Sequence, residues 1–379
     1  MKYLIVVALL SMALVQMGNL GALGYVPVMG SLLLIFVLNQ RVYLSGDLWY
    51  NLGGGLCLAG MALGSILHGN TVSYGYIFFG TVLFFFYPIF RQRGIERYLL
   101  MFVFWVLAIT VMPVSLNQAG IDHFYDNPNN YSGVVLCTMF LGMVVYYDSW
   151  WKQLLIYAVA IGLVLLGASR SILGAVLIFG MLYVGQRYVL RRHLRAVLAV
   201  GFLVMCFAYY TLITDDRFKL METVQQTTVS EHKKERGLSH RDALFYISLN
   251  IARDFPEGVG MGLSNREIGK RYLYAYTPHN TFMKALVEGG WLMFAGLLIL
   301  VLGYFSTNSS YLASSFLFTL CIRGLFESST PFSVSLISTM LVLVMFLDER
   351  SVKMLSDLTI TLPRRTPPVI PESSDHSPQ

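Results

Sequence analysis

Four short stretches place residues capable of acid–base or anion chemistry beside apolar segments. Arg170 lies in "GASRSIL", Arg241 in "SHRDALF", His279 in "TPHNTF" and Arg323 in "CIRGLFES". Arginine presents a planar fork of N–H donors that suits phosphate groups, and a neutral histidine can accept a proton near pH 7. Because polar groups beside an apolar span cost free energy unless they are used, we expect a site for an anionic substrate.

The stretch around His279 resembles the start of a helix. Thr277 is expected as the N-cap and Pro278 as the first helical residue, which would put His279 and Asn280 in the first turn. The helix dipole there disfavours a protonated imidazole, so His279 is a candidate general base. Asn280 is expected to orient a hydroxyl of the substrate or the imidazole. The alternative is an interfacial histidine that only forms hydrogen bonds at the level of the lipid headgroups.

Arg241 opens a segment with the pattern of an amphipathic helix. Ser239 and Asp242 form a capping-box pattern, and Pro256 ends the helix. The apolar face comprises Leu244, Ile247, Ile251 and Phe255. We expect this helix to lie along the outer membrane surface, with Arg241 near helix N–H groups where a phosphate can bind. The alternative is that Arg241 pairs with Asp242 or with lipid headgroups.

Two pairs of opposite charges occur at the i, i+4 spacing of a helix. Arg323 and Glu327 form either an intrahelical ion pair or part of the site. Lys284 and Glu288 are expected to neutralise each other within an apolar span. The glycines at 289–290 beside Glu288 would allow a neighbouring helix to approach closely.

The sequence "NPNNYSG" forms a turn before an apolar run, and turn chemistry alone explains its asparagines. A sugar-binding role for Asn129 is the alternative. The remaining histidines lack metal-ligand spacing, and the chain has no Walker motif or dinucleotide-binding glycine pattern. The four cysteines lie in different apolar runs, which is typical of small core residues. We expect no metal and no cofactor.

The elements that must position these residues are membrane helices. The 379 residues are 56% hydrophobic and 13% charged, with mean hydropathy +0.61, whereas soluble domains carry roughly 25% charged residues. Recurring long apolar runs predict an all-α polytopic membrane protein of about twelve helices. The runs are 3–17, 21–38, 48–67, 74–90, 98–116, 131–147, 154–168, 172–184, 196–213, 280–304, 311–326 and 332–347.

The connecting loops predict the orientation. Alternate loops hold Lys2, Arg41, "RQRGIER" and "RYVLRRHLR", and the positive-inside rule makes this set and both termini cytoplasmic. The net charge of +6 therefore gives no indication of nucleic-acid binding. The segment 215–278 becomes a large outer loop, and every candidate site residue faces the same outer side. We expect one transmembrane domain, 1–347, followed by a disordered Pro/Ser-rich cytoplasmic tail, 348–379.

Four motifs in this order resemble the bacterial O-antigen ligase / O-antigen polymerase superfamily. They are "GASRSILGAVLIF", "SHRDALFYISLNIARDFPEGVGMG", "TPHNTFMKALVEGGWLMFAGL" and "CIRGLFES", and "NPNNYSG" is similar to a weaker family motif. The resemblance covers about 127–347. It implies a glycosyltransferase-C-like fold and an undecaprenyl-diphosphate-linked glycan as donor. It also implies that the transfer takes place at the periplasmic face of the inner membrane and needs no metal ion or nucleotide.

Carried over by residue, the resemblance implies that Arg170 and Arg241 hold the diphosphate and that His279 is the base or orients the acceptor. Arg323 matches an arginine near the outer end of a late span. An inverting mechanism follows, because the base removes a proton from the attacking hydroxyl while the arginines stabilise the leaving diphosphate. Asn129, Asn280, Arg323 and Glu288 are the candidate substrate-binding residues.

Two activities remain open within this resemblance. A polymerase joins repeat units of O-antigen or exopolysaccharide, and a ligase transfers the glycan to lipid A–core in lipopolysaccharide biosynthesis. We favour the polymerase on "NPNNYSG" alone. Expected partners are the lipid-linked glycan, an acceptor glycolipid, the bilayer, and a chain-length regulator or flippase. A more remote alternative is a twelve-helix secondary transporter, but transporters carry repeated halves and charges near the membrane midplane.

Overall fold

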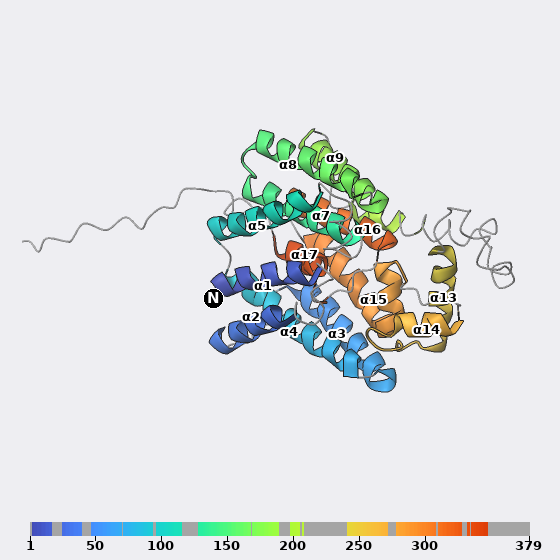
Figure 1. Cartoon of the computed structure of the whole chain (residues 1–379). Helices are drawn as coiled ribbons and strands as arrows, with labels where there is room; N and C mark the ends of the chain where they lie inside the picture. The colour runs from blue at the N-terminus through green and yellow to red at the C-terminus, as the bar shows by residue number, and fades with distance from the viewer. Residues whose placement is uncertain are drawn as a thin grey trace, which may run out of the picture.

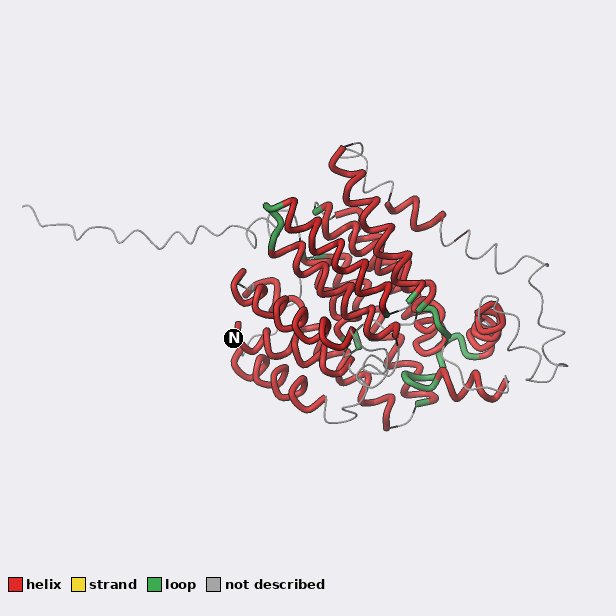
Figure 2. Tube along the Cα trace, turned by 45° about the horizontal axis from the view of Figure 1, so that its top comes forward, coloured by secondary structure: helices red, strands yellow, loops and turns green. Residues whose placement is uncertain are grey.

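The structure is a computed structural model of the whole chain (Figure 1), and helix is its only regular secondary structure in the described residues (Figure 2). Backbone is described for 2–16, 25–39, 47–69, 71–93, 96–115, 128–167, 169–188, 198–204, 207, 241–271, 278–307, 310–327, 332–333 and 335–347. Within these ranges, the side chains of Arg170 and Arg241 lie outside the described part.

The helices before the long loop form the first part of a bundle. They are α1 (Lys2–Gln16), α2 (Tyr25–Asn39), α3 (Leu48–His68), α4 (Thr71–Arg93), α5 (Arg97–Ser115), α7 (Pro128–Val145), α8 (Trp150–Leu166) and α9 (Arg170–Tyr188). The later elements are α13 (Arg241–Asp254), α14 (Ser264–Arg271), α15 (Thr281–Thr307), α16 (Tyr311–Phe326), α17 (Leu336–Leu343) and the 3₁₀ turn η3 (Val344–Phe346).

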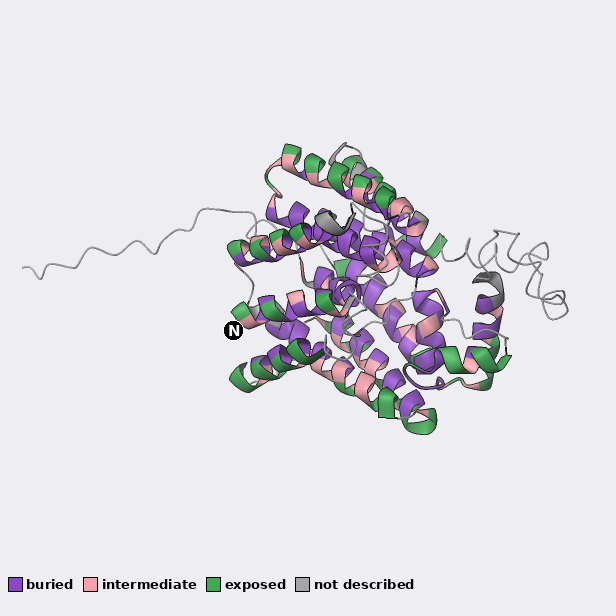
Figure 3. Ribbon diagram, viewed as in Figure 1, coloured by how far each residue is buried: buried purple, intermediate pink, exposed green. Residues whose placement is uncertain are grey.

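Each expected span except 196–213 corresponds to a helix; of that run, 198–204 is described and helical. Within the part of the chain that the structure describes, three helices are long and apolar enough to cross a membrane, at Leu48–His68, Thr71–Ile89 and Thr281–Thr307. Shorter apolar helices accompany them, and many of the helices expose large apolar side chains. Figure 3 shows exposed residues along the outer helices and buried residues toward the middle of the bundle. The chain is a multi-pass helical membrane protein, and the number of twelve spans stays a prediction.

Helices α3 and α15 pack backbone against backbone through glycines. A Cβ added to Gly60 would lie 2.5 Å from the carbonyl oxygen of Gly289, and one added to Gly53 would lie 2.8 Å from that of Gly296. Such close approach is how membrane helices gain packing energy where the hydrophobic effect is weak. Of the two glycines beside Glu288, Gly289 has its backbone against α3, as expected of a neighbouring helix, whereas Gly290 lies against the loop residues Pro256 and Glu257.

The run at 280–304, expected as one regular span, is broken at Gly290, whose φ of 66° and ψ of −165° are not helical. The loop after α13 satisfies the backbone groups that the break releases. Trp291 N donates to Pro256 O over 3.0 Å, and the N–H groups of 259–260 donate to the carbonyls of 287–288 over 2.9 and 3.0 Å. A break at membrane depth is tolerated only when the protein supplies such partners.

Helices α13 and α14 and the loop between them make up residues 241–271, which we call the loop module. Of the long loop, the structure describes this module and Pro278, whereas 215–240 and 272–277 lie outside the described residues. The amphipathic helix is present as α13, but its apolar face is covered by protein. Leu244, Ile247 and Ile251 pack with residues of α14, its preceding loop and α15. The expectation that this face lies on the membrane surface is therefore wrong, because α14 and α15 bury it.

Contacts with α3 and α4 fix the loop module at one end of the bundle (Figure 1). His68 Nε2 and Glu257 Oε1 form a hydrogen bond of 2.6 Å. Met261 N donates to Ser65 Oγ over 3.1 Å, and Ser73 Oγ donates to Met261 O over 2.8 Å. The hydrogen bond from His68 holds the pKa of the Glu257 carboxyl below its ordinary value. The module is thus tied to two spanning helices as well as to α15.

Candidate functional site

Helix α15 begins later than the sequence suggested. Asn280 is its N-cap, because Asn280 Oδ1 accepts hydrogen bonds from the N–H groups of 282–283 over 2.9 and 3.1 Å. The expected cap, Thr277, lies outside the described residues, and Pro278 and His279 precede the helix. The prediction that His279 sits in the first helical turn is therefore wrong, since the asparagine after it is the better cap.

His279 has an unusual backbone and an accessible side chain. Its φ is 31°, a positive value that few residues other than glycine adopt, although histidine is enriched there together with asparagine and aspartate. Such a conformation costs about 1–3 kcal/mol and persists where the surroundings enforce it, often at functional sites. The side chain is 34% exposed, and Nδ1 lies 4.0 Å from Glu327 Oε2. The imidazole thus faces a carboxylate on one side and remains open on another.

Glu327 lies just beyond the end of α16. Its φ of −139° and ψ of 138° are extended, so it is the C-cap and not a helical neighbour of Arg323. The expected intrahelical i, i+4 geometry is therefore wrong, although the two charges still interact electrostatically. The carboxylate turns to other elements: Oε1 accepts a hydrogen bond of 2.7 Å from Asn129 Nδ2 while Oε2 faces His279.

Asn129, at the start of α7, joins this group to the turn before α9. Its Oδ1 accepts a hydrogen bond of 2.7 Å from Ser169 Oγ, and its Nδ2 donates to Glu327. The hydroxyl of Thr281 donates to the backbone oxygen of Glu327 over 3.0 Å. The starts of α7, α9 and α15 and the end of α16 therefore meet at one place, although they are far apart in the sequence.

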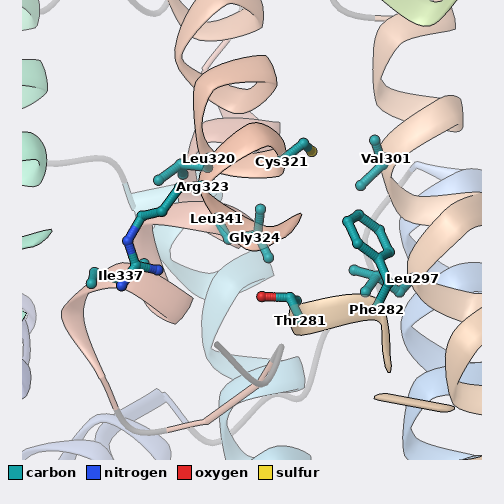
Figure 4. A pocket seen from close by; sticks show the side chains of 10 residues that line it. All are labelled: Thr281, Phe282, Leu297, Val301, Leu320, Cys321, Arg323, Gly324, Ile337 and Leu341. Atoms are coloured by element: carbon teal, nitrogen blue, oxygen red, sulfur yellow. The ribbon is translucent and has the colours of Figure 1, made fainter. Parts of the chain in front are cut away.

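Arg323 lies behind this meeting point, in the last turn of α16, and only 3% of it is exposed. Figure 4 shows its guanidinium directed toward Ile337 at the start of α17, on the edge of a pocket between α15, α16 and α17. The pocket is otherwise mostly apolar. Its lining residues are Thr281, Phe282, Leu297, Val301, Leu320, Cys321, Arg323, Gly324, Ile337 and Leu341. A buried charge at membrane depth usually has a functional reason.

Glu288 stands apart from this group, about two turns further along α15. It is 1% exposed, and its carboxylate accepts a hydrogen bond of 2.6 Å from Ser264 Oγ of α14. Both Glu288 and Lys284 lie in the described part of the chain, and no ion pair within 4.0 Å joins them. The expected mutual neutralisation is therefore wrong, and Glu288 links α15 to the loop module.

The two arginines predicted to bind the diphosphate begin helices. Arg170 opens α9 directly after Ser169, and Arg241 opens α13. Their side chains lie outside the described part, so their contacts stay predictions. The position of Ser169 nevertheless brings the backbone beside Arg170 to the group that contains Glu327 and His279.

Sequence reasoning missed Ser169 and Thr281, and it gave a site role for Glu327 only as the alternative to an ion pair with Arg323. A signal existed for Glu327, because "ESSTP" directly follows the apolar run and such Ser/Pro-rich sequence usually ends a helix. The described residues contain no group of three His, Cys, Asp or Glu suited to a metal ion. What they present is a histidine facing a carboxylate near a buried arginine, and these are the groups that an oriented general base beside an anion site would require.

Residues 154–298 match a family model described as O-antigen ligase. The match runs from α8 into α15 and includes Arg170, Arg241 and His279. It confirms the resemblance to the O-antigen ligase / O-antigen polymerase superfamily that the motifs predict, and it supports a glycosyltransferase activity of that general type. No curated protein and no solved structure matches the chain.

Proposed function

We propose that the protein is a glycosyltransferase that uses an undecaprenyl-diphosphate-linked glycan as donor and extends a surface polysaccharide. The observation that carries the proposal is the placement of His279, 4.0 Å from the Glu327 carboxylate, at the start of a membrane helix within the matched family region. A lipid-linked donor brings its own activated bond and would explain a base beside arginines at the membrane rim.

In the proposed reaction, His279 removes the proton from the acceptor hydroxyl as that oxygen attacks the anomeric carbon of the donor. The new carbon–oxygen bond forms while the bond to the diphosphate oxygen breaks, and the electron pair leaves with the lipid diphosphate. Attack opposite the leaving group inverts the anomeric carbon. Arg170 and Arg241 stabilise the charge that develops on the diphosphate oxygens.

The remaining proposed contacts involve Asn129, Asn280, Arg323 and Glu288. Arg323 would complete the anion site from inside the bundle, because it is buried next to Thr281 at the start of α15. Asn280 Oδ1 serves the helix cap, so its Nδ2 is the group proposed for a sugar hydroxyl. Glu288, bonded to Ser264, would act on the substrate only through the loop module.

We place the site at the periplasmic face of the inner membrane, with both termini in the cytoplasm. The basic residues of the short loops support this orientation. The helix ends that are predicted to face outward also meet at one group of side chains, which is consistent with it. Reporter fusions at Arg236 and Arg192 should report opposite sides of the membrane. A cytoplasmic signal at Arg236 would overturn both the orientation and the mechanism.

The activity test uses the purified protein in lipid nanodiscs with the lipid-linked repeat unit as sole glycan. A polymerase produces a ladder of longer lipid-linked chains, and we expect this result. His279→Ala should reduce the rate by roughly 10²–10⁴, the usual worth of a positioned base, whereas Arg266→Ala, an exposed change on α14, should not. A His279→Ala variant with normal turnover would remove the histidine from the chemistry.

The second candidate is an O-antigen ligase, favoured by the description of the matching family. A ligase would leave the lipid-linked repeat unit unchanged until lipid A–core is added, and it would then form one product on that acceptor. Transport of the lipid-linked glycan without a new glycosidic bond would instead support a transporter. The chain-length regulator or flippase proposed as a partner would alter the product lengths and not the bond formed.

A further inference from the structure

We propose that Glu327 positions His279 for proton transfer, and that Asn129 and Ser169 hold Glu327 in place and connect it to the turn carrying Arg170. This inference rests on the proposed function, because it assigns a task to residues around the proposed base. Its physical basis is a continuous series of contacts, from Ser169 to Asn129, from Asn129 to Glu327, and from Glu327 to His279.

The position of Glu327 after the helix end frees its carboxylate to serve two neighbours. One oxygen accepts the 2.7 Å hydrogen bond from Asn129, and the other faces His279 Nδ1 at 4.0 Å. Had α16 continued through residue 327, the side chain would have stayed on the helical face of Arg323. The extended backbone therefore directs the carboxylate toward α7 and α15.

The backbone of Glu327 is held from two sides. Its N–H donates to Arg323 O over 2.8 Å, and its carbonyl oxygen accepts from Thr281 Oγ1 over 3.0 Å. Thr281 is the first residue of α15, two residues after the imidazole. The carboxylate and the imidazole therefore sit on backbone segments that are bonded to each other, which fixes their relative position.

Asn129 uses both ends of its amide within this series. Oδ1 accepts from Ser169 and Nδ2 donates to Glu327, so the side chain is oriented from both ends. Ser169 directly precedes Arg170, the residue proposed to hold the diphosphate. Two hydrogen bonds thereby join the start of α9 to the Glu327 carboxylate, so a shift at Ser169 would move the carboxylate that faces His279.

The carboxylate lies 4.0 Å from Nδ1, beyond hydrogen-bond distance, so it acts on the imidazole through its charge. It favours the tautomer with hydrogen on Nδ1, which leaves the lone pair of Nε2 to accept the proton of the acceptor hydroxyl. It also stabilises the imidazolium that forms in that step. The two oxygens of Glu327 thus have separate tasks. Oε1, which accepts from Asn129, fixes the position of the carboxylate, and Oε2 favours the form of the imidazole that can accept a proton on Nε2.

The test compares Glu327→Gln with the wild type in the nanodisc assay. Glutamine can still accept the hydrogen bond from Asn129 through its amide oxygen, but it carries no charge. We expect kcat to fall by roughly 10–10³, less than the loss on removing the orienting carboxylate of a serine-protease triad, with little change in the KM for donor. Glu327→Asp should recover part of the loss. Glu96→Gln, a matched change at an exposed carboxylate, should change neither kcat nor KM.

A pH–rate profile separates positioning from a merely structural role. Without the carboxylate the imidazolium is less favoured, so the acidic limb of the kcat profile should move to lower pH in Glu327→Gln. Arg323 interacts with the same carboxylate, and Arg170 follows Ser169. Both stay protonated through the whole range, so neither produces the limb. An unmoved limb would overturn the positioning role.

Two further variants distinguish the ways in which the ideas can fail. The double variant His279→Ala, Glu327→Gln should be no slower than His279→Ala alone, because Glu327 acts through His279. If His279→Ala is inactive while Glu327→Gln has wild-type kcat and pH profile, the inference fails and the proposed function stands. If His279→Ala is fully active, His279 is not the base and the inference fails with it, whereas a wild-type protein that forms no new glycosidic bond in this assay would overturn the proposed function. Should Glu327→Gln not fold, Ser169→Ala tests the same series and should lower kcat several-fold.

Discussion

The hydroxyl of Ser264 donates a 2.6 Å hydrogen bond to the carboxylate of Glu288 and so joins the loop module to α15 just before the break at Gly290. The carboxylate is buried, which makes this donor valuable, because a charged group at membrane depth is costly without partners. The bond lies beside the break at Gly290, where the preceding loop supplies the other backbone partners. The loop module is therefore bonded to α15 and belongs to the folded core of the protein.

Ser264→Ala should destabilise the protein by about 1–3 kcal/mol, the cost of leaving a buried acceptor without its donor. Glu288→Gln should be milder, because its amide oxygen can still accept from Ser264. Thermal unfolding in detergent measures both changes, and Ser306→Ala, a change at an exposed serine on the same helix, is the control. If Glu288→Gln abolishes activity at unchanged stability, the carboxylate has a direct role at the substrate.

Gly60→Ala should destabilise the α3–α15 contact strongly. The added Cβ would lie 2.5 Å from Gly289 O and 2.6 Å from Met293 N, and backbone atoms cannot move aside as a side chain can. We expect a loss of about 3 kcal/mol, the upper end of ordinary overpacking. Gly55→Ala on the same helix has open space around the new Cβ and should be neutral or stabilising. Equal unfolding temperatures for the two variants would contradict the close approach.

Arg170→Ala and Arg241→Ala should each lower the rate by about 10²–10³, by analogy with the loss of one preorganised oxyanion donor. Lysine should restore only part of the rate, because it keeps the charge without the bidentate fork. The nanodisc assay measures these rates, with Arg266→Ala as an exposed arginine control. Full activity of either alanine variant at normal membrane levels would exclude that arginine from the site.

The lengths of the apolar runs predicted most of the helices, because a membrane helix requires a long continuous stretch of apolar residues. It did not predict the break at Gly290, which depends on partners such as Pro256, more than thirty residues earlier in the chain. The sequence pattern of α13 showed that one face is apolar but could not say whether lipid or protein covers it. The structure shows α14 and α15 there.

The candidate site was predicted in its parts and not in its connections. His279 and Arg323 stand out because charge or imidazole is rare beside apolar runs. The spacing of Glu327 and Arg323 left an intrahelical ion pair and a site role open, and the ion-pair alternative requires the helix to continue through both residues. The helix ends at Phe326, and the carboxylate reaches Asn129 instead. Local spacing cannot reveal such contacts between distant segments.

Acid should loosen the contact between the loop module and α3. The hydrogen bond from His68 lowers the folded-state pKa of Glu257 below the ordinary 4.5. The contribution of this group is therefore fully present above about pH 4.5 and is lost as the pH falls through the lower folded value. Hydrogen exchange of 255–271 should increase over that range. In Glu257→Gln this acid-dependent increase should be absent, and an identical pH response in both proteins would contradict the assignment.

Asn280 offers a test of two roles in one side chain. Asn280→Ala removes the cap of α15 and should cost about 0.5–2 kcal/mol of stability. Asn280→Asp keeps an acceptor oxygen for the helix N–H groups but replaces the amide nitrogen. Unfolding should then be close to wild type, while the KM for the acceptor rises several-fold, because Nδ2 is the group proposed to contact a sugar hydroxyl. Steady-state kinetics at saturating donor measures that KM. If Asn280→Asp has wild-type stability and wild-type KM, Asn280 is only a cap, and the sugar contact must be sought elsewhere around His279.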